Sequence, residues 1–234
     1  MIQLRPASSR GYADHGWLHS WHSFSFADYY DPAEMGWGPL RVINEDQVAP
    51  GCGFGKHGHR DMEIITYLVQ GTLRHEDSMG NGAQIRRPEV QRMSAGRGVQ
   101  HSEFNASDSE DVHLLQIWIE PDVRGIAPEY EQKDFPDAGK RDRWCLLASP
   151  DGADGSLTIY QNARLYACLL TAGNVVNYRL LPQRRAYLQM VGGEATLNGM
   201  ELSAGDGAKI DDEINLSVVA QSNAEILLFD LPPG

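Results

Sequence analysis

Residues 51–71 read GCGFGKHGHRDMEIITYLVQG and join two kinds of signal. The first part is a glycine-rich lead-in that ends in His57-Gly58-His59. The second part, IITYLV at 64–69, is a short run of β-branched and aromatic residues. Runs of this length and composition, bounded by glycine, are typical of β-strands. The stretch therefore predicts two histidines presented beside a buried strand.

Similar runs recur between glycine, proline, asparagine and aspartate residues along the whole chain. They are LRVI at 40–43, HLLQIWI at 113–119, SLTIYQ at 156–161, LYACLL at 165–170, AYLQMV at 186–191 and EILLFDL at 225–231. No window keeps a 3.6-residue apolar period over any length, so any helices should be short. The sequence predicts an all-β protein built as a pair of barrels or sandwiches.

The stretch from Pro121 to Arg143 is rich in proline, glycine and charge, which is typical of a linker. It separates halves of similar size that share a repeat, MSAGRG at 93–98 and LSAGDG at 202–207. Each copy is followed by a strand that ends in an acid and a proline. Two copies of one small barrel are therefore expected. The predicted parts are an N-terminal metal-binding domain over 1–130, a linker over 131–143 and a degenerate C-terminal domain over 144–234.

Composition excludes several classes of protein. With 41% apolar and 22% charged residues, the chain is typical of globular proteins, and no apolar run approaches the ~20 residues of a membrane helix. A formal charge of −12 opposes direct binding to nucleic acid. Three scattered cysteines indicate no disulfide framework. The start, MIQLRPASSR, lacks the features of a secretory signal, so we expect a cytoplasmic protein without membrane attachment.

Two pairs of residues with the same spacing predict a metal site. His57 and His59 lie two apart on a strand and face the same side, as do His101 and Glu103 in GRGVQHSEFN. Set opposite each other across a barrel, the pairs supply four ligands with open positions, a set that suits Fe(II), Mn(II), Ni(II), Cu(II) or Zn(II). Burying such a carboxylate without a cation costs several kcal/mol, which favours a bound ion. Glu63 remains an alternative acidic ligand.

The chain resembles a known family around these residues. Gly51, His57-Gly58-His59, Glu63 and Gly71 resemble the first cupin motif, and GRGVQH at 96–101 resembles the second. Within the cupins the chain resembles the pirins, in HGWLHSWHSFSFADYYDP, GFGKHGHRDMEIITY, MSAGRGVQHSEFN, QIWIEP and LLFDLP. Two departures stand out: glycine replaces the usual proline of the second motif, and seven residues rather than six separate Glu63 from Gly71.

The resemblance implies a bicupin, with two β-barrel domains of the double-stranded β-helix or jelly-roll type. In pirins the acidic ligand comes from the second motif, here Glu103, which makes Glu63 a strand residue or a neighbour of the ligands. One divalent transition metal is implied, with Fe(II) expected and Mn, Ni, Cu, Zn or Co as alternatives; no other cofactor is predicted.

Two functions from different classes follow from the resemblance. The first is a dioxygenase that cleaves a flat aromatic flavonol such as quercetin with O2, in which Glu103 is the catalytic residue that accepts the substrate proton. The alternative is a non-enzymatic regulatory protein that senses redox state through its metal and binds a protein partner.

The remaining expectations concern the second half and the other histidines. Aligning the repeats sets Ile210 and Asp212 opposite His101 and Glu103, and Arg179 and Leu181 opposite His57 and His59. The second domain should therefore hold no metal. The block of His15, His19, Trp21, His22, Phe24 and Phe26 is interpreted as a strand over the barrel in preference to a flat ligand wall. His75 and His113 are interpreted as ordinary strand residues.

Overall fold

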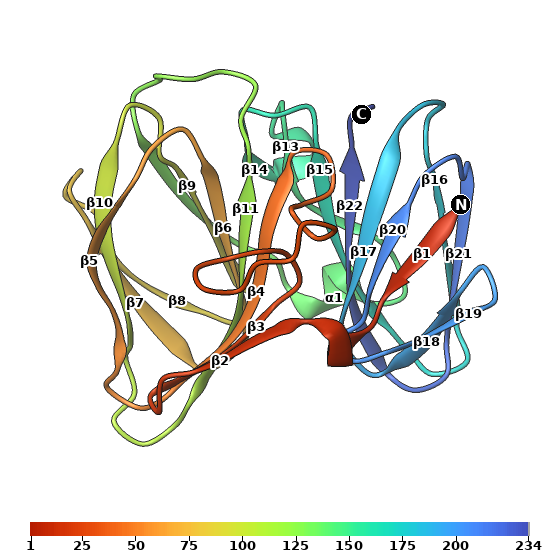
Figure 1. The fold of residues 1–234 in the computed structure, drawn as a ribbon, viewed down its shortest axis with the longest axis horizontal. Helices are drawn as coiled ribbons and strands as arrows, with labels where there is room; N and C mark the ends of the chain where they lie inside the picture. The colour runs from red at the N-terminus through yellow and green to blue at the C-terminus, as the bar shows by residue number, and fades with distance from the viewer. Residues whose placement is uncertain (234) are drawn as a thin grey trace. The chain divides into compact units, whose positions relative to one another are not determined.

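The computed structural model describes residues 1–233, and its regular secondary structure is almost wholly β-strand (Figure 1). Its contacts divide it into two compact units. The N-terminal unit consists of Gly11–Asp134 and Leu157–Gln161, and the C-terminal unit of Met1–Arg10, Phe135–Ser156 and the chain from Asn162 onward. The helices are one turn each, at η1 (Ala7–Ser9), α1 (Asp137–Lys140) and η2 (Ala153–Gly155). The predicted all-β, two-domain fold is confirmed.

Two sheets make up the N-terminal unit. The larger runs in the order β12-β9-β6-β11-β4-β3-β2 and the smaller in the order β5-β10-β7-β8. The strands of the larger sheet are β2 (Gly11–Asp14), β3 (Leu18–His22), β4 (Leu40–Val48), β6 (Glu63–Gln70), β9 (Glu89–Ser94), β11 (Val112–Ile119) and β12 (Glu129–Asp134). Those of the smaller are β5 (Gly53–His59), β7 (Thr72–Asp77), β8 (Gly82–Arg86) and β10 (Val99–Asn105).

The C-terminal unit repeats this plan. Its larger sheet runs β1-β20-β17-β22-β15-β13 and its smaller sheet β16-β21-β18-β19. The strands are β1 (Ile2–Arg5), β13 (Cys145–Ser149), β15 (Arg164–Leu170), β16 (Val175–Arg179), β17 (Arg185–Gly192), β18 (Glu194–Leu197), β19 (Met200–Ser203), β20 (Gly207–Ile210), β21 (Asn215–Ala220) and β22 (Ala224–Leu231). Matching the two orders pairs β5 with β16 and β10 with β21.

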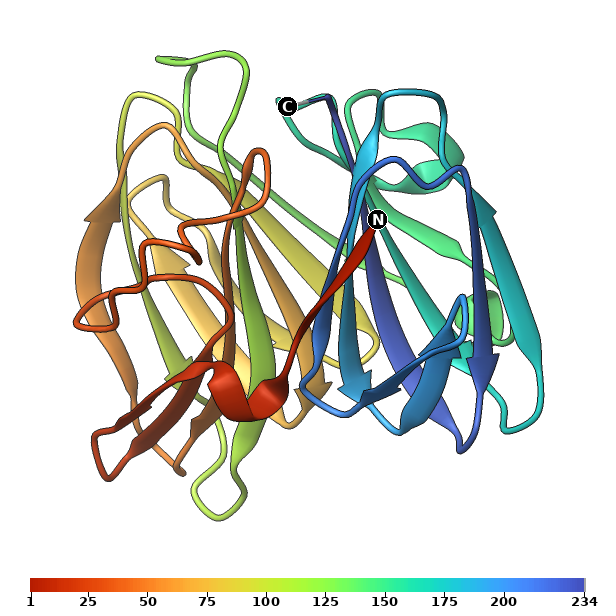
Figure 2. The same cartoon turned by 45° about the vertical axis from the view of Figure 1, so that its right-hand side comes forward.

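The contacts divide the chain differently from the expected ranges at three places. The first strand of the chain, β1, pairs with β20 and so belongs to the C-terminal unit. β12 begins before the expected linker and continues into it as an ordered edge strand paired with β9. The expected strand at 156–161 is reduced to β14 (Leu157–Thr158), which is grouped with the N-terminal unit. Figure 2 shows the red N-terminal strand alongside the blue strands of its unit.

Each unit has its own apolar core between its two sheets. In the N-terminal unit, Leu18, Leu68 and Leu114 of the larger sheet pack with Leu73 and Ile85 of the smaller. In the C-terminal unit a larger cluster fills the corresponding space. Among the described residues, no helix is long and apolar enough to span a membrane.

Candidate metal centre

Two neighbouring strands of the smaller sheet carry the predicted ligands. β5 and β10 are antiparallel neighbours, and their register pairs His101 with His57 and Val99 with His59. The prediction that the two pairs face each other across a barrel is therefore wrong. The histidines meet because directly paired residues on adjacent strands place their side chains on the same face.

Three imidazoles converge at this point. The ring centroids of His57 and His101 lie 4.4 Å apart, those of His57 and His59 4.8 Å, and those of His59 and His101 4.9 Å. One nitrogen from each ring lies within 4.8 Å of a nitrogen of the other two. Three donors at this spacing can share one ion.

The protonation of the rings suits ligation. Burial lowers the pKa of His59 to about 4 and that of His101 to about 3, with the neighbouring histidines acting in the same direction. Both rings are therefore neutral at neutral pH, the form in which imidazole binds metal. His57 donates from Nδ1 to the carbonyl oxygen of Gly55 at 2.7 Å, which leaves Nε2 as the ring nitrogen with a lone pair for a metal.

His101 supplies the test of whether an ion fits. Its side chain is 2% exposed, and neither ring nitrogen has a hydrogen-bond partner among the described residues. A buried polar atom without a partner is costly, and a metal ion bound by the ring would satisfy it. The donor set of three imidazoles with a nearby carboxylate therefore fits a divalent transition metal.

Glu103 stands two residues beyond His101 on the same buried face of β10. Gln116 Nε2 donates to Glu103 Oε2 at 2.7 Å, and Thr66 Oγ1 donates to Oε1 at 3.4 Å. Burial raises the pKa of Glu103 to about 7 in spite of these donors. Glu103 forms a second close triplet with His101 and His75, which shares only His101 with the three-histidine cluster. Its role as a fourth ligand stays a prediction.

His75 is the residue that the sequence interpretation missed. Its side chain is fully buried on β7, and its ring centroid lies 5.3 Å from that of His101. Gln91 Nε2 contacts Nδ1 at 3.4 Å, and Nε2 contacts Asp77 Oδ2 at 3.2 Å. The only available signal was the two-residue spacing of His75 and Asp77, which pairs a ring with an acid on one strand face.

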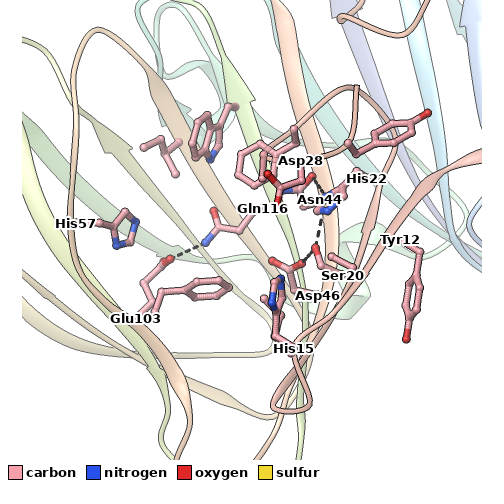
Figure 3. A pocket seen from close by; sticks show the side chains of 18 of the residues that line it. Tyr12, His15, Ser20, His22, Asp28, Asn44, Asp46, His57, Glu103 and Gln116 are labelled. Carbon is pink, nitrogen blue, oxygen red and sulfur yellow. Dashed lines mark hydrogen bonds between the residues drawn. The ribbon is translucent and has the colours of Figure 1, made fainter. Parts of the chain in front are cut away.

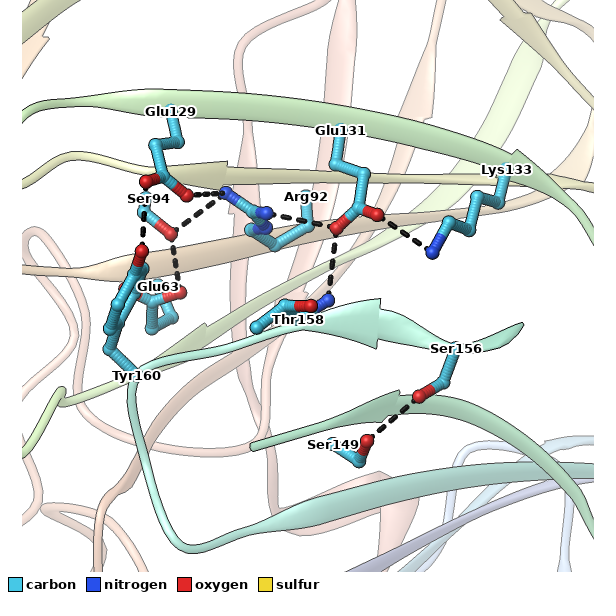
Figure 4. Close-up of polar contacts among 10 residues, drawn as sticks. All are labelled: Glu63, Arg92, Ser94, Glu129, Glu131, Lys133, Ser149, Ser156, Thr158 and Tyr160. Carbon is cyan, nitrogen blue, oxygen red and sulfur yellow. Dashed lines mark hydrogen bonds and ion pairs between the residues drawn. The ribbon is translucent and has the colours of Figure 1, made fainter. Parts of the chain in front are cut away.

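Glu63 lies on the other face of its sheet. On β6 its neighbours Ile64 and Thr66 face the cluster, so Glu63 points away from it. Glu63 accepts a 2.7 Å hydrogen bond from Ser94 Oγ, and Ser94 in turn accepts one from Arg92 at 3.0 Å (Figure 4). Glu63 belongs to neither close group of candidate ligands.

A row of polar side chains crosses the inner face of the larger sheet at the height of the cluster. We call it the polar row; in strand order its members are His22, Asn44, Gln116, Thr66 and Gln91, one per strand in direct register. All five are buried. Leu68 and Leu114 lie on one side of the row, and Ile64 and Met93 lie on the other. The row thus places hydrogen-bonding groups where a sandwich would otherwise bury apolar residues.

An aromatic cavity of about 580 Å³ opens beside the cluster (Figure 3). Trp118 lies 4.9 Å from His59 and 5.4 Å from Phe26 between ring centroids, and Trp17 lies 5.4 Å from Phe54. From the N-terminal aromatic block, His15, His22 and Phe26 line this cavity, whereas His19, Trp21 and Phe24 do not. The block is therefore partly the strand β3 and partly the wall of a cavity.

The correspondence between the two halves that the motifs MSAGRG and LSAGDG predict is wrong. The first motif joins β9 to β10, whereas the second joins β19 to β20, one strand earlier in the shared plan. The true counterparts of β5 and β10 are β16 and β21, whose buried or half-buried inward residues are Val176, Tyr178, Leu216, Val218 and Ala220. These side chains offer no imidazole or carboxylate. The absence of metal there stays a prediction.

Comparison with known proteins places the chain in a family. Residues 3–119 match the Pirin family model, and residues 146–231 match the model described as Quercetinase C-terminal cupin domain. The chain is 50% identical over 234 residues to a protein of Escherichia coli (strain K12) named quercetin 2,3-dioxygenase, with both chains fully covered. It is 44% identical over 232 residues to a pirin-like protein of Caulobacter vibrioides, covering 98% of this chain and 99% of that one.

Solved structures agree with this placement. The bacterial pirin YhhW from Escherichia coli, in complex with nickel(II), superposes with a TM-score of 0.96 at 49% identity, with 100% of both chains covered. A crystal structure of YhhW without a named ligand gives 0.97 at 50% identity, covering 100% of this chain and 99% of that one. The expected resemblance is thereby confirmed, and the chain belongs to the pirin family.

Proposed function

We propose that this protein is a metal-dependent dioxygenase that cleaves a flavonol such as quercetin with O2. His57, His59 and His101 would hold the ion, with Glu103 as the fourth ligand. The observation that carries the proposal is the position of three imidazoles and a buried carboxylate at the wall of an aromatic cavity of about 580 Å³. Cavities of this size and lining are typical of sites for small ligands.

The names of full-length relatives support the choice of reaction. The Escherichia coli relative at 50% identity is named quercetin 2,3-dioxygenase, and a relative from Pseudomonas aeruginosa at 46% identity is named a putative enzyme of the same kind. The nickel(II) complex of YhhW supports a divalent metal in this fold. Iron is the expected ion because its Fe(II) state suits chemistry with O2, and manganese, nickel, copper, zinc and cobalt are the alternatives.

The side chains have separable tasks in this proposal. Trp118 and Phe26 provide flat walls that orient a planar ring. Glu103 would accept the proton of the substrate hydroxyl, while Gln116 and Thr66 hold its carboxylate in place. The bound ion would supply a Lewis acid that favours the deprotonated hydroxyl. A cytoplasmic location is part of the same proposal.

An oxygen electrode tests the proposal. Iron-loaded protein of measured occupancy should consume O2 with quercetin and release carbon monoxide. A flavone that lacks the 3-hydroxyl should be a poor substrate, because it lacks the group that would chelate the ion. His57→Ala provides the background. Oxygen uptake with quercetin that does not exceed this background would refute the enzyme proposal for this substrate and favour the regulatory alternative.

A further inference from the structure

The cavity has a second polar wall, distinct from the histidine cluster. Ser20 and His22 on β3 pair directly with Asp46 and Asn44 on β4, and all four side chains are only 3 or 4% exposed. They line the same cavity as the cluster but belong to the larger sheet. Figure 3 shows them on one side of the pocket, with His57 and Glu103 on the other.

Hydrogen bonds fix the orientation of this wall. Ser20 Oγ donates to Asp46 Oδ1. The His22 ring bonds through Nδ1 to the Asn44 side-chain oxygen at 2.8 Å; because an amide oxygen only accepts, Nδ1 is the donor. The Asp46 carboxylate is therefore held in one position by Ser20, beside a ring that is itself fixed.

Asp46 has fewer donors than a buried carboxylate normally has. Among the described residues, Ser20 is the only one whose side chain donates to it. None of the described residues that line the cavity is a lysine or an arginine. By contrast, Glu103 receives two side-chain donors. Burial accordingly raises the pKa of Asp46 to about 7. A buried acceptor without its full set of donors is costly, and a ligand that brings a donor into the cavity removes that cost.

We propose that Asp46, oriented by Ser20, is the binding site for a phenolic hydroxyl of the ligand other than the one that faces the histidine cluster. The inference rests on the proposed function, because it assumes a flat aromatic ligand in this cavity. It adds the substrate class: a planar arene with hydroxyl groups on two edges.

Charge in the cavity also limits the class. Asp46, Glu103 and Asp28 all line it, and the described lining has no opposing lysine or arginine. A neutral phenol donates to these acids, whereas a sulfate or carboxylate substituent would be repelled. The site should therefore select free polyphenols over their anionic conjugates.

Direct binding tests this inference without turnover. Trp17 and Trp118 line the cavity, so quenching of their fluorescence under anaerobic conditions reports occupancy. The purified protein, with metal occupancy measured, is titrated with quercetin and with 3-hydroxyflavone, which keeps the 3-hydroxyl and lacks the others. The parent should bind quercetin about 10-fold more tightly or better, the scale of satisfying one buried acceptor that otherwise lacks a donor.

The variant Asp46→Ala should lose this preference. Its Kd for quercetin should rise about 10-fold while that for 3-hydroxyflavone changes little, since only quercetin offers the additional hydroxyl. Asp46→Leu, which roughly keeps the side-chain volume, tests the same preference if the alanine variant fails to fold. Glu45→Ala is the matched control: Glu45 is the neighbour of Asp46 on β4 but bonds outward to His113 at 2.9 Å. It should keep the parental preference.

The outcomes separate the two proposals. If both Asp46 variants still bind quercetin more tightly than 3-hydroxyflavone, this inference is overturned, even if the protein turns quercetin over. A preference lost in the Asp46 variants but kept in Glu45→Ala supports it even if no oxygen is consumed. If the parent binds the two flavonols equally, Asp46 binds no additional hydroxyl of quercetin and the inference fails.

Discussion

Gln116 Nε2 donates a 2.7 Å hydrogen bond to Glu103 Oε2, joining the two sheets of the N-terminal unit beside the histidine cluster. Gln116 also lines the cavity, and its side-chain oxygen is buried without a partner among the described residues. The bond is thus the main support of the predicted acidic ligand, and it is made by a residue that belongs to no metal-binding motif.

We expect Gln116→Ala to weaken metal binding without unfolding the protein. Among the described residues, removing this donor leaves the Glu103 carboxylate with one side-chain donor, the 3.4 Å contact from Thr66. Loss of such a supporting hydrogen bond lowers metal affinity by about 10 to 100-fold. Competition with a chelator measures the change. Gln47→Ala, on the exposed face of β4, is the control. Equal affinity in Gln116→Ala and the control would remove Gln116 from the site.

The two candidate acids can be separated by parallel amide substitutions. Glu103→Gln should lose most of the metal because the acid lies beside His101. Glu63→Gln should keep metal within about 10-fold of the parent, because its side chain faces the opposite side of β6 and bonds to Ser94. Elemental analysis of the metal content of both variants after dialysis distinguishes the two acids. A metal-free Glu63→Gln beside a fully loaded Glu103→Gln would reverse the assignment.

Glu63 should also make stability depend on pH. Burial raises the pKa of Glu63 to about 7 from a usual 4.5. Between these values the folded chain keeps a proton that the unfolded chain has released, so stability falls as pH rises through this window. The free energy of unfolding of Glu63→Gln, relative to that of the parent, should therefore rise by about 3 kcal/mol between pH 5 and pH 8. Urea unfolding of metal-saturated protein measures this, with Asp108→Asn in an exposed loop as control. Parallel stability curves for Glu63→Gln and the parent would contradict it.

Much of the fold could be predicted because its signals are local. The run at 64–69 lies within β6 (Glu63–Gln70), and the run at 113–119 lies within β11 (Val112–Ile119). The histidines of β5 and β10 could be identified because a two-residue spacing sets the face of a strand whatever its partner is. Strand composition and period are properties of a few neighbouring residues.

What the sequence did not reveal depends on register. His75 reaches His101 only because β7 pairs with β10, and the polar row forms only because five strands align in register. A shift of one residue would turn any of these side chains to the other face, and no local pattern fixes the register. The repeat misled for a related reason. Gly96 and Gly205 both occupy positive φ in turns, so the shared SAG marks a type of turn and not an equivalent strand.

The last prediction concerns whether His75 is a ligand or a support. Because Gln91 Nε2 can only donate, His75 Nδ1 accepts, and Nε2 must then donate to Asp77. Burial lowers the pKa of His75, so the ring is neutral and both nitrogens are already used. We therefore expect it to hold His101 in place by packing rather than to bind the ion.

The substitution His75→Phe, which keeps a ring against His101, should leave about one ion per chain and lower metal affinity by no more than the ~10 to 100-fold typical of residues behind the ligands. His101→Ala should instead strip most of the metal while β-sheet circular dichroism persists, because the apolar core packs away from the cluster. His113 lies on the outer face of β11 and bonds to Glu45, so His113→Phe controls for the loss of an unrelated imidazole. Elemental analysis and chelator competition on all three variants give the answer. If His75→Phe is as metal-free as His101→Ala, His75 is itself a ligand, and the triplet of His75, His101 and Glu103 is the true metal site.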